Sequence, residues 1–222
     1  MIVIKNLTKK FNNENHLMFN DYVFDDGKTY VITGPSGCGK STLLNLIAGI
    51  ISPTTGEIIT TIDEKITPIN TLKQKERDSF RFKNIGYVFQ DFKLVEDFTV
   101  LDNLKMLNIN GKIYSNEDFD NALALTHISK KKKQKVKTLS GGEKQRVSIA
   151  RAIMKKSNIV LADEPTESLN ETLSHEIIEL LTSIAKSENK TLIMVTHDNS
   201  LTKYFDIHLD VKDFMKEEVS NV

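Results

Sequence analysis

Short apolar runs alternate along the chain with longer segments that carry apolar residues at helical spacing. The strand-like runs are residues 29–33, 85–89, 158–163 and 191–196, and the helical segments are residues 40–48, 143–155 and 173–184. Buried strands that alternate with amphipathic helices are typical of a parallel sheet covered on both faces. The pattern therefore predicts an α/β fold with a mainly parallel sheet.

Two regions depart from this alternation. Residues 1–28 and about 56–66 have the pattern of short antiparallel strands, and residues about 93–138 have the pattern of helices. We therefore expect a single domain, residues 1–222, in which a β subdomain and an α-helical subdomain are attached to one core. Apolar residues at every second position from 205 to 211 predict a last, half-exposed strand.

The composition allows a large core and gives no general attraction to polyanions. The chain has 222 residues, of which 39% are hydrophobic, and 30 basic residues balance 30 acidic ones. Since the formal net charge is zero, we expect no nucleic-acid partner. The lysines at residues 130–133 could attract an acidic partner, but a solvated turn is the preferred interpretation.

The cysteine content and the apolar runs indicate a chain that does not cross a membrane itself. A single cysteine, Cys38, cannot form an internal disulfide, which fits a reducing compartment. The N-terminus lacks the apolar region of a signal peptide, and no apolar stretch approaches the roughly 20 residues of a spanning helix. We expect a cytoplasmic chain, and any role at a membrane requires another chain to span it.

The segment GPSGCGKS at residues 34–41 matches the phosphate-binding pattern G-x-x-x-x-G-K-[ST] and lies between a predicted strand and a predicted helix. Glycines let the backbone curl so that N–H groups converge on phosphate oxygens, and the helix adds its positive N-terminal end. Lys40 is expected to reach the β- and γ-phosphates, and the Ser41 hydroxyl to bind Mg²⁺. The residues predicted to bind the nucleotide are Gly34, Pro35, Ser36, Gly37, Cys38, Gly39, Lys40, Ser41 and Thr42.

Two acidic residues, Asp163 and Glu164, end the apolar run at residues 158–163. Ligands of a parallel sheet bind at the carboxyl ends of its strands, which would bring these carboxylates beside the phosphate loop. Asp163 is then expected to hold Mg²⁺, through water, and Glu164 to orient and deprotonate the attacking water. An acid after a buried strand can also be only a turn or a helix cap, so this prediction depends on the phosphate loop.

A second candidate anion site opens the helix at residues 143–155. Ser140 is a good N-cap, and Gly141 and Gly142 expose backbone N–H groups at the positive end of that helix. Because one phosphate loop is enough for one nucleotide, a second anion site suits the γ-phosphate of an ATP that another copy of the chain holds. Taken as local structure alone, the segment is a capped helix start.

Residues 139–145, LSGGEKQ, resemble the signature of the ATP-binding cassette (ABC) family of transporter ATPases. Four further features follow in the family's order: Phe11 at the aromatic residue that stacks on adenine, Gln90 at the Q-loop glutamine, residues 168–170 at the D-loop and His197 at the switch histidine. The resemblance covers nearly the whole chain. It implies a P-loop NTPase core of the RecA-like type, with ATP and Mg²⁺ as ligands.

The resemblance also implies the catalytic roles. Gln90 would sense Mg²⁺ and the attacking water, would bind the metal together with Ser41 and Asp163, and would link the site to a membrane partner. His197 would contact the γ-phosphate and hold Glu164 and the water in line.

Two further implications concern the dimer and the base of the nucleotide. Ser140, Gly141 and Gly142 would act on the ATP of a second copy, so that two chains close head to tail over two nucleotides. Phe11 would stack on adenine, or else belong to the core of the β subdomain. The D-loop of the family normally ends in aspartate, and Asn170 keeps its shape without its charge, which affects coupling between the two sites.

Residues 80–103 are similar to the macrolide-exporter and lipoprotein-release group, in which the cassette is a stand-alone chain that works with a separate integral membrane permease. This similarity implies ATP hydrolysis that powers export or membrane extraction, at the inner face of the cell membrane. A permease helix is expected to dock near Gln90, where apolar surface would come from Phe92, Leu94, Val95 and Phe98. The alternative is that these four residues belong to the core of the helical subdomain.

Two alternatives remain for the function. One is a regulatory cassette, like the cell-division type, that signals through a permease-like partner without transport. The other is a nucleic-acid or translation machine of the same superfamily. Against the second, the chain has no second cassette, no long coiled-coil insertion and no basic excess.

Overall fold

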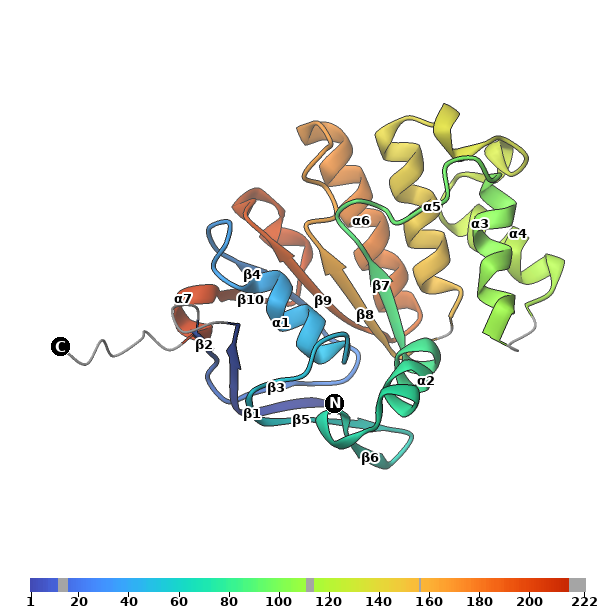
Figure 1. Cartoon of the computed structure of the whole chain (residues 1–222). Coiled ribbons are helices and arrows are strands. Elements are labelled where there is room, and N and C mark those ends of the chain that lie inside the picture. Colours follow the sequence, from blue (N-terminus) through green and yellow to red (C-terminus); the bar gives the residue numbers. More distant parts are fainter. Residues whose placement is uncertain (12–15, 111–113, 156, 216–222) are drawn as a thin grey trace.

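The computed structural model describes residues 1–11, 16–110, 114–155 and 157–215, which form two sheets with helices packed on them and between them (Figure 1). One sheet is parallel, with the strand order β10-β4-β9-β8-β7. Its strands are β4 (Thr29–Thr33), β7 (Ile85–Val88), β8 (Ile159–Asp163), β9 (Thr191–Thr196) and β10 (Ile207–Asp210). The predicted α/β fold with a mainly parallel sheet is confirmed.

The parallel strands are apolar along their length because both of their faces are buried. Successive side chains point to opposite faces of a strand. In β4, Tyr30 and Ile32 pack into the cluster that contains α1, whereas Val31 packs into the cluster of α5 and α6. Ile193 and Met194 of β9 divide between the same two clusters. A strand buried on both faces has no polar side, so its sequence does not alternate.

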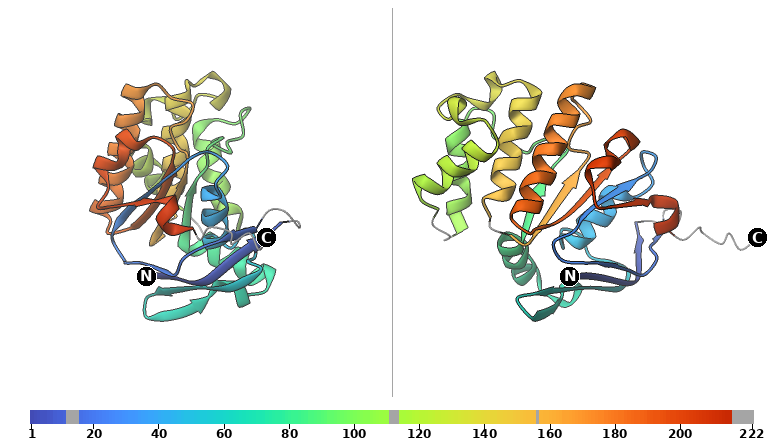
Figure 2. Two further views of the ribbon diagram at one scale, coloured as in Figure 1. Left: turned by 90° about the vertical axis from the view of Figure 1, so that its left-hand side faces the viewer. Right: turned by 180° about the vertical axis from the view of Figure 1, so that it is seen from behind.

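Helices cover both faces of the parallel sheet (Figure 2). Helix α1 (Lys40–Ile47) lies between the two sheets, because Leu43 and Ile47 share a buried cluster with Ile4 of the antiparallel sheet. Helices α5 (Gly141–Ile153) and α6 (Glu171–Ser187) pack on the opposite face. Among the described residues, no helix combines the length and the apolar character that a bilayer crossing requires.

The second sheet is antiparallel and comes from the two N-terminal regions where short strands were predicted. Its strands are β1 (Ile2–Lys10), β2 (His16–Met18), β3 (Tyr22–Phe24), β5 (Thr55–Ile62) and β6 (Lys65–Pro68). The strand order is β2-β1-β5-β6, and β3 pairs with β1. The β5–β6 hairpin continues to Pro68, two residues beyond the predicted end at about residue 66.

A helical part between β7 and α5 forms its own buried cluster. It contains α3 (Val100–Lys105), α4 (Asn116–Leu125) and 3₁₀ turns at Met106–Asn110, Ser129–Lys131 and Val136–Thr138. Leu104, Phe119 and Leu123 pack with Val147 of α5, whereas Leu125 is 46% exposed. In the lysine run, Lys131 and Lys132 form surface ion pairs with Glu143 and Asp120.

The sequence pattern missed helix α2 (Gln74–Asn84). This helix buries none of its residues completely, so it has no apolar stripe that could reveal its period. Its start is defined by the Lys73 N–H, which donates to the Glu76 carboxylate at 2.8 Å.

The last predicted strand is shorter than expected. The prediction ran from residue 205 to residue 211, but β10 covers only Ile207–Asp210, and the short helix α7 (Val211–Phe214) begins directly after it. The Asp210 side chain accepts a hydrogen bond from the Lys212 N–H and caps α7. Val211 is buried as part of this helix and not of the strand. The alternation of apolar residues therefore continues beyond the end of β10.

Candidate functional site

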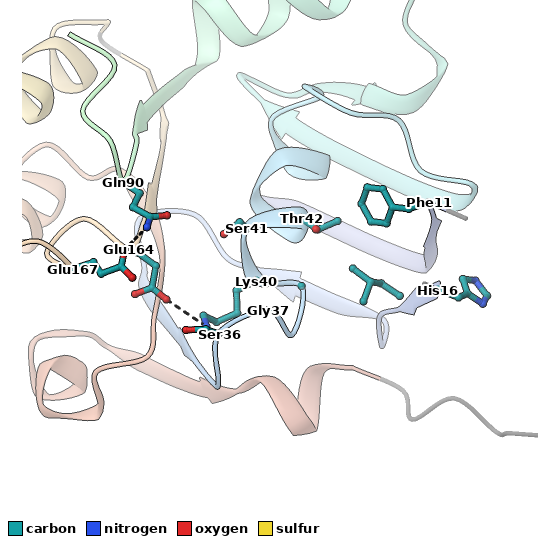
Figure 3. A pocket seen from close by; sticks show the side chains of 12 residues that line it. Phe11, His16, Ser36, Gly37, Lys40, Ser41, Thr42, Gln90, Glu164 and Glu167 are labelled. Atoms are coloured by element: carbon teal, nitrogen blue, oxygen red, sulfur yellow. Dashed lines mark hydrogen bonds and ion pairs between the residues drawn. The ribbon is translucent and has the colours of Figure 1, made fainter. Parts of the chain in front are cut away.

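The predicted catalytic residues lie at the carboxyl ends of four neighbouring strands of the parallel sheet. The phosphate loop follows β4, Gln90 follows β7, Glu164 follows β8 and His197 follows β9. Since these strands are parallel neighbours, their ends form one edge of the sheet. A pocket of about 530 Å³ lies at this edge. Figure 3 shows Lys40, Gln90 and Glu164 among the side chains that line it.

The phosphate loop depends on two glycines with left-handed backbone. Gly37 has φ 80° and Gly39 has φ 101°, values that glycine adopts at no steric cost. Gly39 is also the N-cap of α1, and as a glycine it has no side chain with which to cap this helix end. The first N–H groups of α1 are therefore directed toward the loop, where a phosphate would bind.

Lys40 is almost completely buried at the centre of the pocket. Its ammonium group donates to the carbonyl oxygens of Gly34 at 2.7 Å and Pro35 at 2.9 Å, and lies 3.4 Å from Oε1 of Glu164. These oxygens supply the negative partners that a buried ammonium needs. The arrangement is suited to exchanging one of them for a phosphate oxygen.

Ser41 and Asp163 bring two oxygen ligands together. The Ser41 hydroxyl donates to Oδ1 of Asp163 at 2.7 Å across the gap between α1 and β8. Burial raises the pKa of the Asp163 carboxyl above its ordinary value, and the charge of Glu164 adds to the rise, whereas the Ser41 hydrogen bond and Lys40 oppose it. A hydroxyl and a partly desolvated carboxylate are oxygen donors of the kind that Mg²⁺ prefers, so these residues fit the predicted metal.

Glu164 is buried between a cation and a histidine. Its Oε2 accepts from the His197 N–H at 3.2 Å and lies 3.0 Å from His197 Nδ1, while Oε1 faces Lys40. The residue has φ 43°, a left-handed value that is uncommon outside glycine, and its N–H donates to the Val195 carbonyl. The turn after β8 therefore directs this carboxylate into the pocket.

Phe11 lies at the opposite end of the pocket from Gln90 and Glu164 (Figure 3). The residue is 57% exposed, so the alternative of a core residue is wrong. Lys9 Nζ lies 5.4 Å from the ring centroid. An exposed aromatic face at one end of a phosphate pocket is available for stacking on a base.

The pocket also has lining residues that the sequence motifs did not indicate, namely His16, Leu17 and Glu167. His16 and Leu17 belong to a three-residue strand whose pairing with β1 places them there. Glu167 follows Glu164 by three residues, and the Gln90 amide Nε2 donates a hydrogen bond to its Oε2. The sequence feature that could have indicated Glu167 is an acidic residue three positions after Glu164.

Most of the predicted site residues come together in this one pocket. Those that line it are Phe11, Ser36, Gly37, Gly39, Lys40, Ser41, Thr42, Gln90 and Glu164. Asp163 and His197 reach the pocket through their partners Ser41 and Glu164. The Cys38 side chain instead packs against the buried cluster of α1, so only its backbone is available to a phosphate.

The predicted second anion site does not line this pocket. Ser140 caps α5, with its Oγ accepting from the Glu143 N–H at 3.3 Å and its own N–H donating to the Glu143 carboxylate at 2.9 Å. Ser140 and Gly141 are exposed, and the first N–H groups of α5 have no acceptor within the helix. A ligand at this helix end would have to come from elsewhere than the chain's own phosphate loop.

Asn170, where the resemblance led us to expect aspartate, has a structural role. Its side-chain oxygen accepts from the Leu173 N–H at 3.0 Å and caps α6. Asparagine and aspartate serve nearly equally as N-caps, so the departure keeps the start of this helix.

A glycine loop that leads into a helix N-terminus, followed by carboxylates at the neighbouring strand ends, defines the chain as a P-loop nucleoside triphosphatase.

Comparisons with known proteins identify the family. A family model described as "ABC transporter" matches residues 20–167. The chain is 36% identical over 214 residues to the lipoprotein-releasing system ATP-binding protein LolD of Bacteroides fragilis, with 94% of this chain and 97% of the relative covered. It is 38% identical over 178 residues to the ABC transporter ATP-binding protein YtrE of Bacillus subtilis, with 79% of this chain and 75% of the relative covered.

A solved structure agrees with this family. The dimeric ATP-binding cassette MJ0796, in a post-hydrolysis state bound to ADP and Pi, is similar with a TM-score of 0.81 and 33% identity over 94% of each chain. The chain belongs to the ABC transporter family. It is an ATP-binding subunit with ATPase activity.

Proposed function

We propose that this ATPase powers export or membrane extraction through a separate permease, and that two copies close head to tail over two ATP molecules. The observation that carries the proposal is the separation, within one chain, of the phosphate pocket from the exposed anion site at Ser140 and Gly141. Each site would be completed by the other chain's α5. The similar cassette MJ0796, described as dimeric and bound to ADP and Pi, supports the formation of a dimer.

The chemistry that we propose uses the contacts already present in the pocket. Lys40 would exchange one of its oxygen partners for a phosphate oxygen, and Ser41, Asp163 and Gln90 would hold Mg²⁺. The metal, when bound, would neutralise charge on the β- and γ-phosphates. Glu164 would accept a proton from the attacking water as a general base. His197 would hold that carboxylate in line while contacting the γ-phosphate.

A surface cleft of about 620 Å³ between α2 and α5 supports permease docking. Its apolar lining includes Ile50, Phe82, Phe89 and Leu107, and its basic lining includes Arg81, Lys93 and Arg151. The predicted apolar residues Phe92, Leu94, Val95 and Phe98 are not in this lining. Leu94 packs against the helical cluster, and Val95 and Phe98 are exposed outside the cleft. We therefore move the proposed docking site to the cleft itself.

A partly buried arginine connects the cleft to the nucleotide pocket. The Arg151 guanidinium donates to the carbonyl oxygens of Phe92 at 2.7 Å and Lys93 at 2.5 Å, two and three residues after Gln90. Burial lowers the pKa of Arg151 from its ordinary value, but guanidinium remains charged at neutral pH. A helix that presses on this cleft would therefore act on the segment that carries Gln90.

The experiment that tests transport uses vesicles that contain the chain and the membrane protein that copurifies with it. ATP-dependent movement of a cargo across or out of the bilayer, lost in the Lys40→Ala variant, is the expected result. ATP-dependent dimerisation without any cargo movement would instead support the regulatory cassette. Because the LolD relative is named as part of a lipoprotein-releasing system, a lipoprotein is the first cargo to test.

A further inference from the structure

Glu167 lies beside Gln90 at one end of the pocket and accepts a hydrogen bond from its side-chain amide (Figure 3). Gln90 comes from the end of β7, and Glu167 from the turn that connects β8 to α6. This turn is itself well defined, since the Glu167 N–H donates to the Glu164 carbonyl at 3.3 Å and the Leu169 N–H to the Thr166 carbonyl at 3.0 Å. The contact thus joins two segments that flank the proposed metal ligands.

The chemistry of this hydrogen bond determines which way the Gln90 amide points. An ionised carboxylate can only accept, whereas an amide has a donating NH₂ group and an accepting oxygen. Glu167 therefore selects the orientation in which Nε2 faces it and Oε1 faces away. A cation can bind only the oxygen, so an amide turned the other way would present N–H groups to the metal and would repel it.

We propose that Glu167 is a positioning residue, which orients the Gln90 amide so that its oxygen is available to Mg²⁺. This inference rests on the proposed role of Gln90 as a metal ligand. Glu167 would act as the outer-shell partner of a ligand, as carboxylates do behind metal-binding histidines. Because it belongs to the turn that leads into Asn170 and α6, it also links the Gln90 segment to the D-loop of the same chain.

The test measures metal affinity directly. Mn²⁺, a spectroscopic substitute for Mg²⁺, would be titrated by electron paramagnetic resonance against full-length chains that carry Glu164→Gln and saturating ATP. In this background we expect Glu167→Ala to weaken Mn²⁺ binding about tenfold, at the lower end of the effects of outer-shell partners. Glu167→Gln keeps an acceptor oxygen, so it should recover part of the affinity. Glu171→Ala, which removes an exposed carboxylate four residues further on, is the charge-matched control and should bind Mn²⁺ normally.

A double-mutant cycle with Gln90→Ala separates positioning from direct binding. If Glu167 acts through Gln90, adding Glu167→Ala to Gln90→Ala should cause no further loss of Mn²⁺ affinity. An equal further loss would make Glu167 a metal ligand itself and overturn the inference. Unchanged affinity in Glu167→Ala alone would also overturn it. If Gln90→Ala alone binds Mn²⁺ normally, the proposed role of Gln90 fails, and the inference fails with it for that separate reason.

Folding of the variants is measured independently. Glu167 and Gln90 are not in the buried clusters, so thermal unfolding without nucleotide should change little in either variant. ATP-induced protection against unfolding in the presence of EDTA should likewise stay within twofold of the parent in apparent affinity. A loss of ATP affinity without metal would assign Glu167 to nucleotide binding and overturn the positioning role.

Discussion

The carboxylate of Glu164 is bonded twice by His197, through its backbone N–H at 3.2 Å and its ring Nδ1 at 3.0 Å. The two residues come from the ends of adjacent strands, β8 and β9, so the parallel sheet itself fixes their approach. The other oxygen of Glu164 faces Lys40 at 3.4 Å. If a phosphate took the place of Glu164 at Lys40, the two contacts with His197 would still orient this carboxylate.

This relationship predicts the result of replacing the proposed base. Glu164→Gln keeps an oxygen that can accept from the His197 N–H but cannot take a proton from water. We expect kcat for ATP hydrolysis to fall by about 100-fold or more while ATP still binds, and the closed dimer to accumulate. Steady-state turnover and size-exclusion chromatography with ATP measure the two effects.

A histidine outside the nucleotide pocket supplies a control for this site. His175 on α6 lies 3.1 Å from the Tyr204 hydroxyl and does not line the nucleotide pocket. His175→Ala should therefore hydrolyse ATP at the parental rate. Parental turnover in Glu164→Gln would contradict the assignment of Glu164 as the base.

Buried strands and the phosphate loop were predictable because each restricts which residue types can stand at its positions. The strands β4 and β9 were predicted with their observed ends, because both are continuous apolar runs bounded by polar residues. The positions around the phosphate loop were predictable because the chemistry restricts residue types at fixed spacing. Helix α2 could not be predicted from apolar spacing, because it buries none of its residues completely.

The side-chain contacts between separate segments were beyond the sequence patterns. The contact between Gln90 and Glu167 joins residues 77 positions apart, and no local pattern relates them. The lining of the proposed docking cleft was likewise not evident from the sequence, because Phe98 is 47% exposed whereas Leu94 packs against the helical cluster, a difference that the apolar pattern does not show. Only the packing of α2, β7 and α5 determines which apolar side chains line the cleft.

The raised pKa of Asp163 predicts a conflict between stability and function. The pKa of this carboxyl is higher in the folded protein than in the unfolded chain, so the nucleotide-free protein binds the proton more tightly when it is folded. The free energy of unfolding therefore falls as the pH rises through the folded-state pKa. Asp163→Asn, which can still accept from Ser41, should therefore raise the melting temperature of the nucleotide-free protein at pH 7. About 2–4 °C is expected for each kcal/mol gained.

The pH dependence supplies the control for this prediction. Below about pH 4, where the carboxyl is protonated even in the unfolded chain, the difference between Asp163→Asn and the parent should shrink. The same variant should lose Mg²⁺-dependent hydrolysis. A melting temperature below that of the parent at pH 7 would show that the ionised carboxylate stabilises the resting site, against the expectation.

The proposed docking cleft predicts a separation of membrane association from catalysis. Ile50 is 39% exposed and lines the cleft, so Ile50→Asp should fold normally yet place a charge against an apolar partner. We expect most of the chain to move from the membrane pellet to the supernatant when it is expressed with its membrane partner. ATP hydrolysis by the isolated chain should stay at the parental level.

An apolar residue outside the cleft is the matched control. Ile66 on β6 is 69% exposed and does not line the cleft, so Ile66→Asp should remain in the membrane pellet. Equal membrane association of the two variants would refute this cleft as the docking site.

The composite site predicts complementation between two inactive variants. Lys40→Ala removes the phosphate contact of one chain, and Ser140→Arg blocks the anion site that the chain would offer to its partner. Each variant alone forms dimers in which both sites are damaged. In a mixed dimer, one site combines both lesions and the other combines an intact phosphate loop with an intact Ser140. Mixing equal amounts should therefore restore roughly a quarter of the parental sites, because half of the dimers are mixed.

The restored ATPase should depend steeply on total protein concentration, since it requires association. If each chain completes its own site, the mixture will be as inactive as its components at every concentration, and turnover per subunit in the parent will not change on dilution.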